Sequence, residues 1–172
     1  TAVMNIKITQ TDQSRISEID FNNLQFGRVF SDHMFEMVYR DGKWLDPEIK
    51  PYGPITFDPS LMALHYGQAI FEGMKAYYAD DQTINLFRPT DHHKRLNNSA
   101  KRLCMPEIEE SVFIDALEKL LQLDYKWVPK THGHAVYVRT LMFASEEYIP
   151  ATVSKEYHFY ISTSPVAAYY EE

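Results

Sequence analysis

The stretch Ala63-Leu-His-Tyr-Gly-Gln-Ala-Ile-Phe-Glu-Gly-Met-Lys-Ala-Tyr77 is the most informative part of this chain. Ser60, just before it, is a residue type that caps helix N-termini. Gly73 is a residue type that ends helices in the left-handed conformation. We therefore predict a helix from Ser60 to about Glu72. Such a helix would carry Tyr66 and Phe71 about 140° apart around its axis, so that the two rings flank rather than stack.

Beyond Gly73, residues 74–78 alternate between apolar and polar side chains in the manner of a strand. Asp80-Asp81 favours a turn, and residues 83–87 are predicted to return beside the first strand. Further upstream, the dipeptide Asp41-Gly42 is a strong signal for a tight turn, which predicts a hairpin between residues 34–39 and 43–45.

The remaining elements follow from the same rules. Residues 3–8 alternate weakly and favour an edge strand, and residues 26–39 favour one or two strands. Four prolines between residues 47 and 59 favour an extended connection, because each lacks a backbone donor. Helices are predicted from Thr90 or Asp91 to Cys104 and from Ser111 onward, and strands over residues 135–142 and 157–163. The apolar face of the second helix is Phe113, Ala116, Leu117, Leu120 and Leu121.

This pattern predicts an α+β fold, an antiparallel β-sheet with two or three helices, and no repeated βαβ alternation. The net charge of −7 argues against nucleic-acid binding. No apolar run is long enough to span a bilayer, and residues 1–13 lack a signal-peptide pattern. With a single cysteine, Cys104, the chain fits a reducing compartment, and we expect a cytoplasmic protein.

Arg95 is the first candidate binding residue, because it follows the predicted helix start at Asp91 by one turn. A guanidinium near free helix amides can grip a phosphate. The alternative is an ordinary solvated arginine on a basic helix, since Lys94, Lys101 and Arg102 lie on the same segment.

Tyr137 and Arg139 are the second candidate, because period-two alternation puts both on one face of their strand. A tyrosine hydroxyl beside a guanidinium can bind a carboxylate. A structural pair on a half-solvated face is the alternative. A metal site is not expected, because the adjacent His92 and His93 diverge on a helix, and His132 and His134 have no ligand partners at suitable spacing.

Several motifs together resemble the branched-chain amino acid aminotransferases, which are pyridoxal-phosphate enzymes of fold type IV. They are Phe26-Gly-Arg-Val-Phe-Ser-Asp-His-Met34, residues 64–76, Leu86-Phe-Arg-Pro89, Arg95, Ser99-Ala100 with Arg102-Leu103, and Tyr137-Val-Arg139. They match in order and spacing over nearly the whole chain from Phe26 onward. One departure is Thr140, where that family usually has proline.

The resemblance implies a role for each matched position. Arg95 would bind the phosphate of pyridoxal 5'-phosphate, and Arg139 would receive the distal carboxylate of glutamate or 2-oxoglutarate. The substrate side-chain pocket would be lined by aromatic residues, with two more residues lent across the interface of a homodimer. The aromatic positions are Phe26, Tyr66, Phe71, Tyr137 and Tyr169, and the lent positions are Ile149 and Ala151.

The resemblance also implies a domain assignment, with residues 1–165 as the N-terminal small domain and 166–172 as the start of a linker. The catalytic lysine of that family lies in a C-terminal large domain, and neither Lys75 nor Lys94 aligns with it. The implied activity is transfer of the amino group of leucine, isoleucine or valine to 2-oxoglutarate. Alternatives are a D-amino acid aminotransferase, an aminodeoxychorismate lyase, or a non-catalytic binding module.

Overall fold

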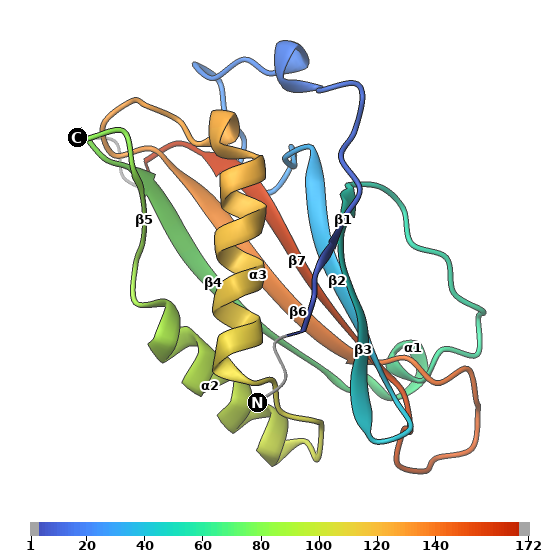
Figure 1. Cartoon of the computed structure of the whole chain (residues 1–172). Coiled ribbons are helices and arrows are strands. Elements are labelled where there is room, and N and C mark those ends of the chain that lie inside the picture. Colours follow the sequence, from blue (N-terminus) through green and yellow to red (C-terminus); the bar gives the residue numbers. More distant parts are fainter. Residues whose placement is uncertain (1–3, 169–172) are drawn as a thin grey trace.

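A single curled sheet with two long helices across one face forms the body of the molecule (Figure 1). The computed structural model describes residues 4–168, and these form a seven-stranded sheet in the order β1-β3-β2-β7-β6-β4-β5. The strands are β1 (Lys7–Ile8), β2 (His33–Arg40), β3 (Lys43–Pro51), β4 (Ala69–Tyr78), β5 (Ile84–Leu86), β6 (Ala135–Ala144) and β7 (Tyr157–Val166). The helices are α1 (Met62–Tyr66), α2 (Pro89–Arg102) and α3 (Glu110–Leu123), with 3-10 turns at Ile16–Glu18 and Tyr125–Trp127.

The predicted α+β class is therefore confirmed, with one correction to the sheet. All the pairings are antiparallel except the one between β1 and β3, which is parallel, so the sheet is mixed. The short β1 lies at the edge, where residues 3–8 were expected to lie. β1 and β2 lie on opposite sides of β3, so the chain crosses over between them, and β1 runs parallel to β3.

The hairpin predicted around Asp41-Gly42 is confirmed as the β2–β3 turn. Asp41 and Gly42 have φ angles of 52° and 78°, the left-handed values that a tight primed hairpin turn requires. The second strand is longer than expected, because β3 continues through Pro47 to Pro51. These prolines are tolerated because β1 pairs with β3 only at Glu48 and Ile49, which leaves the rest of that edge without a required donor.

The helix predicted from Ser60 to Glu72 is wrong in length. α1 ends at Tyr66, and Gly67 forms the left-handed cap with a φ of 66°. The chain then enters β4, in which Ile70, Glu72 and Met74 are buried while Phe71 is exposed. The helical spacing of apolar residues was misleading, because β4 pairs along eight residues with the central strand β6 and this pairing overrides local preference.

The helices α2 and α3 cover the face of the sheet turned toward the viewer in Figure 1. The predicted apolar face of α3 is confirmed, since Phe113, Ala116, Leu117, Leu120 and Leu121 are all buried. Both helix starts differ slightly from the prediction. The N-cap of α2 is Arg88, and the N-cap of α3 is Glu109, so Asp91 and Ser111 lie inside their helices.

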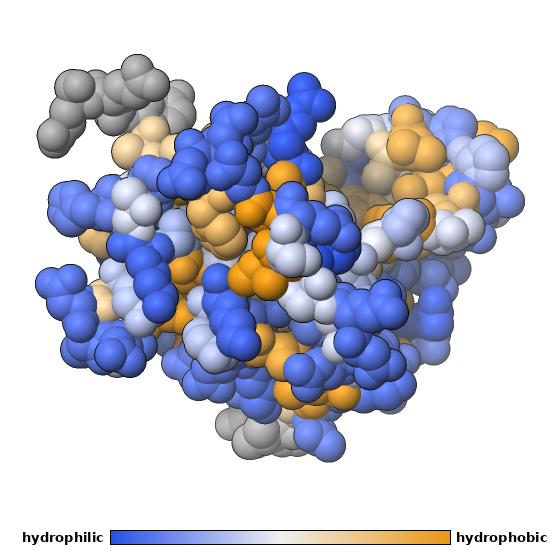
Figure 2. Space-filling model, turned by 90° about the horizontal axis from the view of Figure 1, so that it is seen from above, coloured by the Kyte–Doolittle hydropathy of each residue, from blue (hydrophilic) through white to orange (hydrophobic). Residues whose placement is uncertain are grey.

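The core lies between these helices and the sheet, around Phe35, Met37, Phe113, Phe159 and Ile161. A smaller apolar cluster lies on the opposite face, under the connection between β3 and α1. It is formed by Met34, Leu61, Phe143 and Tyr160. The opposite face is only partly covered, since Phe26 and Phe71 are exposed on it. Seen from above, apolar residues reach the exterior between charged ones (Figure 2).

A buried polar network fastens the N-terminal segment to the end of α3. His33 accepts from the N–H of Thr11 through Nε2 at 2.9 Å, so its Nδ1 carries the proton and donates to Asp124 at 2.7 Å. The neighbouring Asp32 accepts from Trp127 Nε1 at 3.0 Å and from Ser14 Oγ at 2.6 Å. Burial raises the pKa of the Asp124 carboxyl.

The variant Asp32→Asn tests this network. Burial acts to raise the pKa of Asp32, but the hydrogen bonds from Ser14, the Arg15 N–H and Trp127 outweigh it and hold that pKa below its ordinary value. We expect the variant to lose about 1–3 kcal/mol of unfolding free energy at pH 7, measured by urea denaturation.

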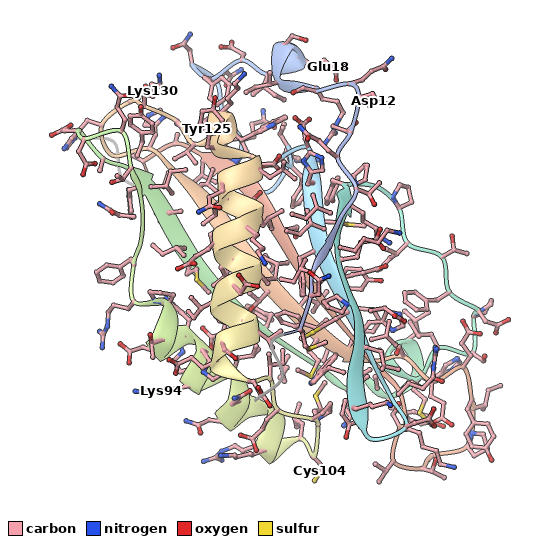
Figure 3. All side chains as sticks on the ribbon, viewed as in Figure 1. Asp12, Glu18, Lys94, Cys104, Tyr125 and Lys130 are labelled. Atoms are coloured by element: carbon pink, nitrogen blue, oxygen red, sulfur yellow. The ribbon has the colours of Figure 1, made fainter. Side chains whose placement is uncertain are left out.

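The difference in unfolding free energy between the wild type and Asp32→Asn should also depend on pH. A carboxyl with a lowered folded-state pKa stabilises the fold above its unfolded pKa of about 4 and loses that effect as the pH falls through the folded value. This difference in unfolding free energy should therefore become smaller below about pH 4. Asp12→Asn, a change of the same charge at an exposed position that Figure 3 labels, serves as the control. A gap that widens in acid would contradict this account.

Within residues 4–168, none of the helices has the length and apolar character needed to cross a lipid bilayer.

Candidate functional site

Four of the predicted site residues converge on the open face of the sheet. Arg139 on β6 donates to the hydroxyl of Tyr137 from Nε at 3.2 Å and from Nη2 at 2.9 Å. Its guanidinium carbon lies 4.1 Å from the centre of the Phe71 ring on β4, which is a cation–π contact. The Phe26 ring meets Tyr137 edge to face, with centroids 5.0 Å apart. The group of Phe26, Phe71, Tyr137 and Arg139 is called the arginine–aromatic cluster below.

Glycine at position 73 is required by this cluster. Gly73 pairs with Arg139 in the β4–β6 register, and the Tyr137 side chain lies directly over it. A Cβ atom at this position would come within 2.1 Å of the Tyr137 hydroxyl oxygen and 2.7 Å of its ring carbon Cζ. The glycine therefore does not end a helix, as its sequence context suggested, but makes room for an aromatic ring across the strand pair.

Arg95 is held by a carboxylate that lies beneath it. Glu72 on β4 is 5% exposed at its side chain, whereas the side chain of Arg95 on α2 is 70% exposed. Arg95 donates from Nε to Glu72 Oε1 at 3.0 Å, and its Nη2 lies 2.9 Å from Oε2. His92 Nδ1 lies 3.0 Å from the same Oε2, and because a carboxylate only accepts, the imidazole donates.

The outer side of Arg95 borders a shallow pocket of about 240 Å³ at the N-terminal half of α2. Its lining residues are Phe87, Arg88, Asp91, His92 and Arg95. Arg88 donates from Nε to Asp91 at 2.6 Å, and this hydrogen bond lowers the pKa of the Asp91 carboxyl below its ordinary value. The donor set of guanidiniums and imidazole suits an anion such as a phosphate.

Tyr66 and Ile149 form a separate contact, in which the Tyr66 hydroxyl donates to the carbonyl oxygen of Ile149. Both residues are exposed, as is Ala151 two residues further along the same loop. Tyr169 lies outside the described residues. The structure therefore joins Tyr66 to the loop that contains Ile149, and their roles in a substrate pocket stay predictions.

The two halves of the candidate site lie on opposite faces of β4. Phe71 and Glu72 are consecutive residues, so Phe71 points to the arginine–aromatic cluster and Glu72 to α2 and Arg95. In the described part of the chain, β5 pairs with β4 only at residues 76–78, which leaves the edge of β4 beside Phe71 and Glu72 without a strand partner. The sheet therefore separates Arg139 from Arg95.

Sequence reasoning missed Glu72 and His92 as members of the site. The signal was present, because Glu72 is the charged residue on the otherwise apolar face formed by Ile70, Met74 and Ala76. It was hidden because the segment was expected to be helical. Lys94, next to Arg95, is exposed and projects outward from α2 (Figure 3).

Within residues 4–168, no three histidine, cysteine, aspartate or glutamate side chains are grouped so that they could hold a metal ion.

Comparison with known proteins shows which sequences and folds this chain is similar to. No family model matches the chain. The chain is 45% identical over 154 residues to branched-chain-amino-acid aminotransferase 2 of Bacillus subtilis, covering 89% of this chain and 42% of that protein. It is 43% identical over 151 residues to the branched-chain-amino-acid aminotransferase of Mycolicibacterium smegmatis, covering 87% of this chain and 41% of that protein.

Solved structures agree on the fold. The crystal structure of the Escherichia coli branched-chain amino acid aminotransferase matches with a TM-score of 0.57 at 22% identity, covering 80% of this chain and 41% of that one. The enzyme of Thermoproteus uzoniensis, solved with norvaline, matches with a TM-score of 0.57 at 21% identity, covering 77% and 41%.

The fold is therefore that of one part of an aminotransferase. By sequence, the chain is homologous to the branched-chain-amino-acid aminotransferases, and it spans about two fifths of the length of the curated relatives that it matches.

The variant Gly73→Ala tests the packing of the arginine–aromatic cluster. Because the new methyl group would meet the Tyr137 hydroxyl at 2.1 Å, the ring must move, and we expect a loss of about 1–3 kcal/mol of unfolding free energy. Gly53→Ala is the matched control, because a Cβ at Gly53 meets nothing within 4 Å. Equal unfolding free energies for the two variants would contradict the close approach of Tyr137 to β4.

Proposed function

We propose that this chain forms part of a pyridoxal-phosphate-dependent aminotransferase that moves the amino group of leucine, isoleucine or valine to 2-oxoglutarate. The observation that carries the proposal is the arginine–aromatic cluster, in which one guanidinium lies against aromatic rings. The homology to proteins named branched-chain-amino-acid aminotransferases supports it.

The cluster fits the two kinds of side chain that such an enzyme must accept in one pocket. Phe26 and Phe71 are 60% and 58% exposed, so apolar ring surface is available to an aliphatic side chain. Arg139, with its Nε and Nη2 occupied by Tyr137, still has N–H groups free to donate to the distal carboxylate of glutamate or 2-oxoglutarate.

The pocket beside Arg95 fits the phosphate of pyridoxal 5'-phosphate. Arg95 and Arg88 line it, and the side chain of Arg95 is 70% exposed. A related fold has been solved with pyridoxamine 5'-phosphate. When bound, the cofactor supplies a carbonyl group and an electron-withdrawing ring, while Arg95 holds its phosphate and the cluster orients the substrate side chain.

The rest of the enzyme is also part of this proposal. We infer that residues 1–165 form a small N-terminal domain, that 166–172 begin a linker, and that the catalytic lysine belongs to a further domain. The exposed Ile149 and Ala151 suit a homodimer in which one subunit completes the pocket of the other. The single cysteine of the chain favours a cytoplasmic enzyme.

The variant Arg139→Ala separates the two substrate classes. We expect kcat/KM for glutamate and 2-oxoglutarate to fall about 10- to 100-fold, because a charge-assisted contact to the distal carboxylate is lost. The value for leucine should change by less than about threefold, since its side chain carries no charge. Arg40→Ala, which removes an exposed arginine at the end of β2 that is paired with Glu156, is the matched control. Equal losses for both substrates would remove this role for Arg139.

Borohydride reduction of the full-length gene product from its source cells tests the cofactor and the domain assignment together. Reduction fixes a carbonyl cofactor onto the lysine that holds it, and peptide mass mapping then locates that lysine. We expect a pyridoxyl-lysine in a peptide outside these 172 residues. A modified lysine inside this chain would overturn the domain assignment, and the absence of any modified lysine would overturn the proposed function.

A further inference from the structure

Glu72 is a buried carboxylate that none of the substrate or cofactor contacts above uses. It lies among the apolar residues Ile70 and Met74 on the helix-facing side of β4. Burying a charged carboxylate in such surroundings is costly unless donors compensate it. Here both oxygens are engaged, Oε1 by Arg95 Nε and Oε2 by Arg95 Nη2 and His92 Nδ1.

The two donors come from one face of α2, because residues 92 and 95 are three apart on the helix. The side chains of Glu72 and His92 are 5% and 17% exposed, so neither is free to move into solvent. The contact ties the centre of β4 to α2 at the point where the anion pocket opens. The position of the Glu72 carboxylate is therefore fixed, unlike that of a carboxylate in an exposed surface ion pair.

The contact also fixes the orientation of Arg95. A guanidinium is planar, and engaging its Nε–H and one Nη2–H sets the direction of the whole plane. The N–H groups that remain, on Nη1 and the other side of Nη2, point away from Glu72. A free arginine side chain, 70% exposed on a helix, would otherwise sample many rotamers.

We propose that Glu72 is the positioning residue of the anion site: it acts through Arg95, setting the guanidinium so that its outward N–H groups meet a phosphate as a two-point contact. His92 donates to the same carboxylate at Oε2. This inference rests on the proposed function, since it assigns the phosphate of pyridoxal 5'-phosphate as the anion that Arg95 receives. It requires Glu72 to affect phosphate binding without touching the phosphate.

The test compares two probes that differ only in the phosphate. Dissociation constants of pyridoxal 5'-phosphate and of pyridoxal are measured by equilibrium dialysis with the full-length apoprotein, for wild type, Glu72→Gln, Arg95→Ala and the double variant. We expect Glu72→Gln to raise the dissociation constant of pyridoxal 5'-phosphate roughly tenfold and to leave that of pyridoxal unchanged. In the Arg95→Ala background, Glu72→Gln should have no further effect, because its partner is gone.

Glu107→Gln is the matched control, since it makes the same substitution in an exposed pair with Lys101 at the far end of α2. If Glu72 had a merely structural role, Glu72→Gln would weaken the binding of both probes alike, or its effect on binding would add to that of Arg95→Ala. Either result would overturn the inference. If the wild type binds neither probe, the proposed function fails and the inference with it. If Arg95→Ala weakens the binding of pyridoxal 5'-phosphate but Glu72→Gln does not, the positioning role of Glu72 is overturned and the proposed function stands.

A second variant serves if Glu72→Gln does not fold. Arg95→Lys keeps the positive charge but lacks the planar fork that Glu72 orients. We expect it to lose most of the affinity for pyridoxal 5'-phosphate that Arg95→Ala loses. Affinity equal to that of the wild type would mean that a point charge is enough, which would overturn the positioning role.

Discussion

The alternation of side chains along β4 is the constraint on which the candidate site depends. Because consecutive residues of a strand point to opposite faces, Phe71 joins the arginine–aromatic cluster while Glu72 turns to α2 and Arg95. A shift of one residue in the pairing of β4 with β6 would exchange these faces, and both the arginine–aromatic cluster and the Glu72–Arg95 pair would be lost. The register Gly73 to Arg139 therefore decides which residues the candidate site brings together.

That register is held by packing on both faces. On the helix side, Ile70, Met74 and Ala76 are buried against the core that includes α2 and α3. On the open side, the absence of a side chain at Gly73 leaves room for the Tyr137 ring over the strand, where its hydroxyl accepts from Arg139. The same strand pair therefore closes the core on one face and carries the arginine–aromatic cluster on the other.

The two arginines are stabilised in different ways, which under the proposed function suits two different anions. Arg139 is supported by neutral partners, the Tyr137 hydroxyl and the Phe71 ring, so it keeps its full positive charge for an incoming carboxylate. Arg95 is neutralised in part by Glu72 and Arg88 by Asp91, so the pocket offers the remaining N–H donors of two guanidiniums and not a large net positive charge. A phosphate with two negative charges needs the larger group of donors.

The sequence by itself determined the α+β class, the hairpin at Asp41-Gly42, the apolar face of α3 and the pairing of Tyr137 with Arg139 on one strand face. These features depend on local patterns, namely turn residues and periodicity. Only the tertiary structure decided that residues 69–78 form a strand, because pairing with the central strand β6 outweighs their helical spacing. It also decided that Glu72 and His92 belong to the site. Their link to Arg95 joins a strand to a helix about twenty residues away, and no local pattern encodes a contact of that kind.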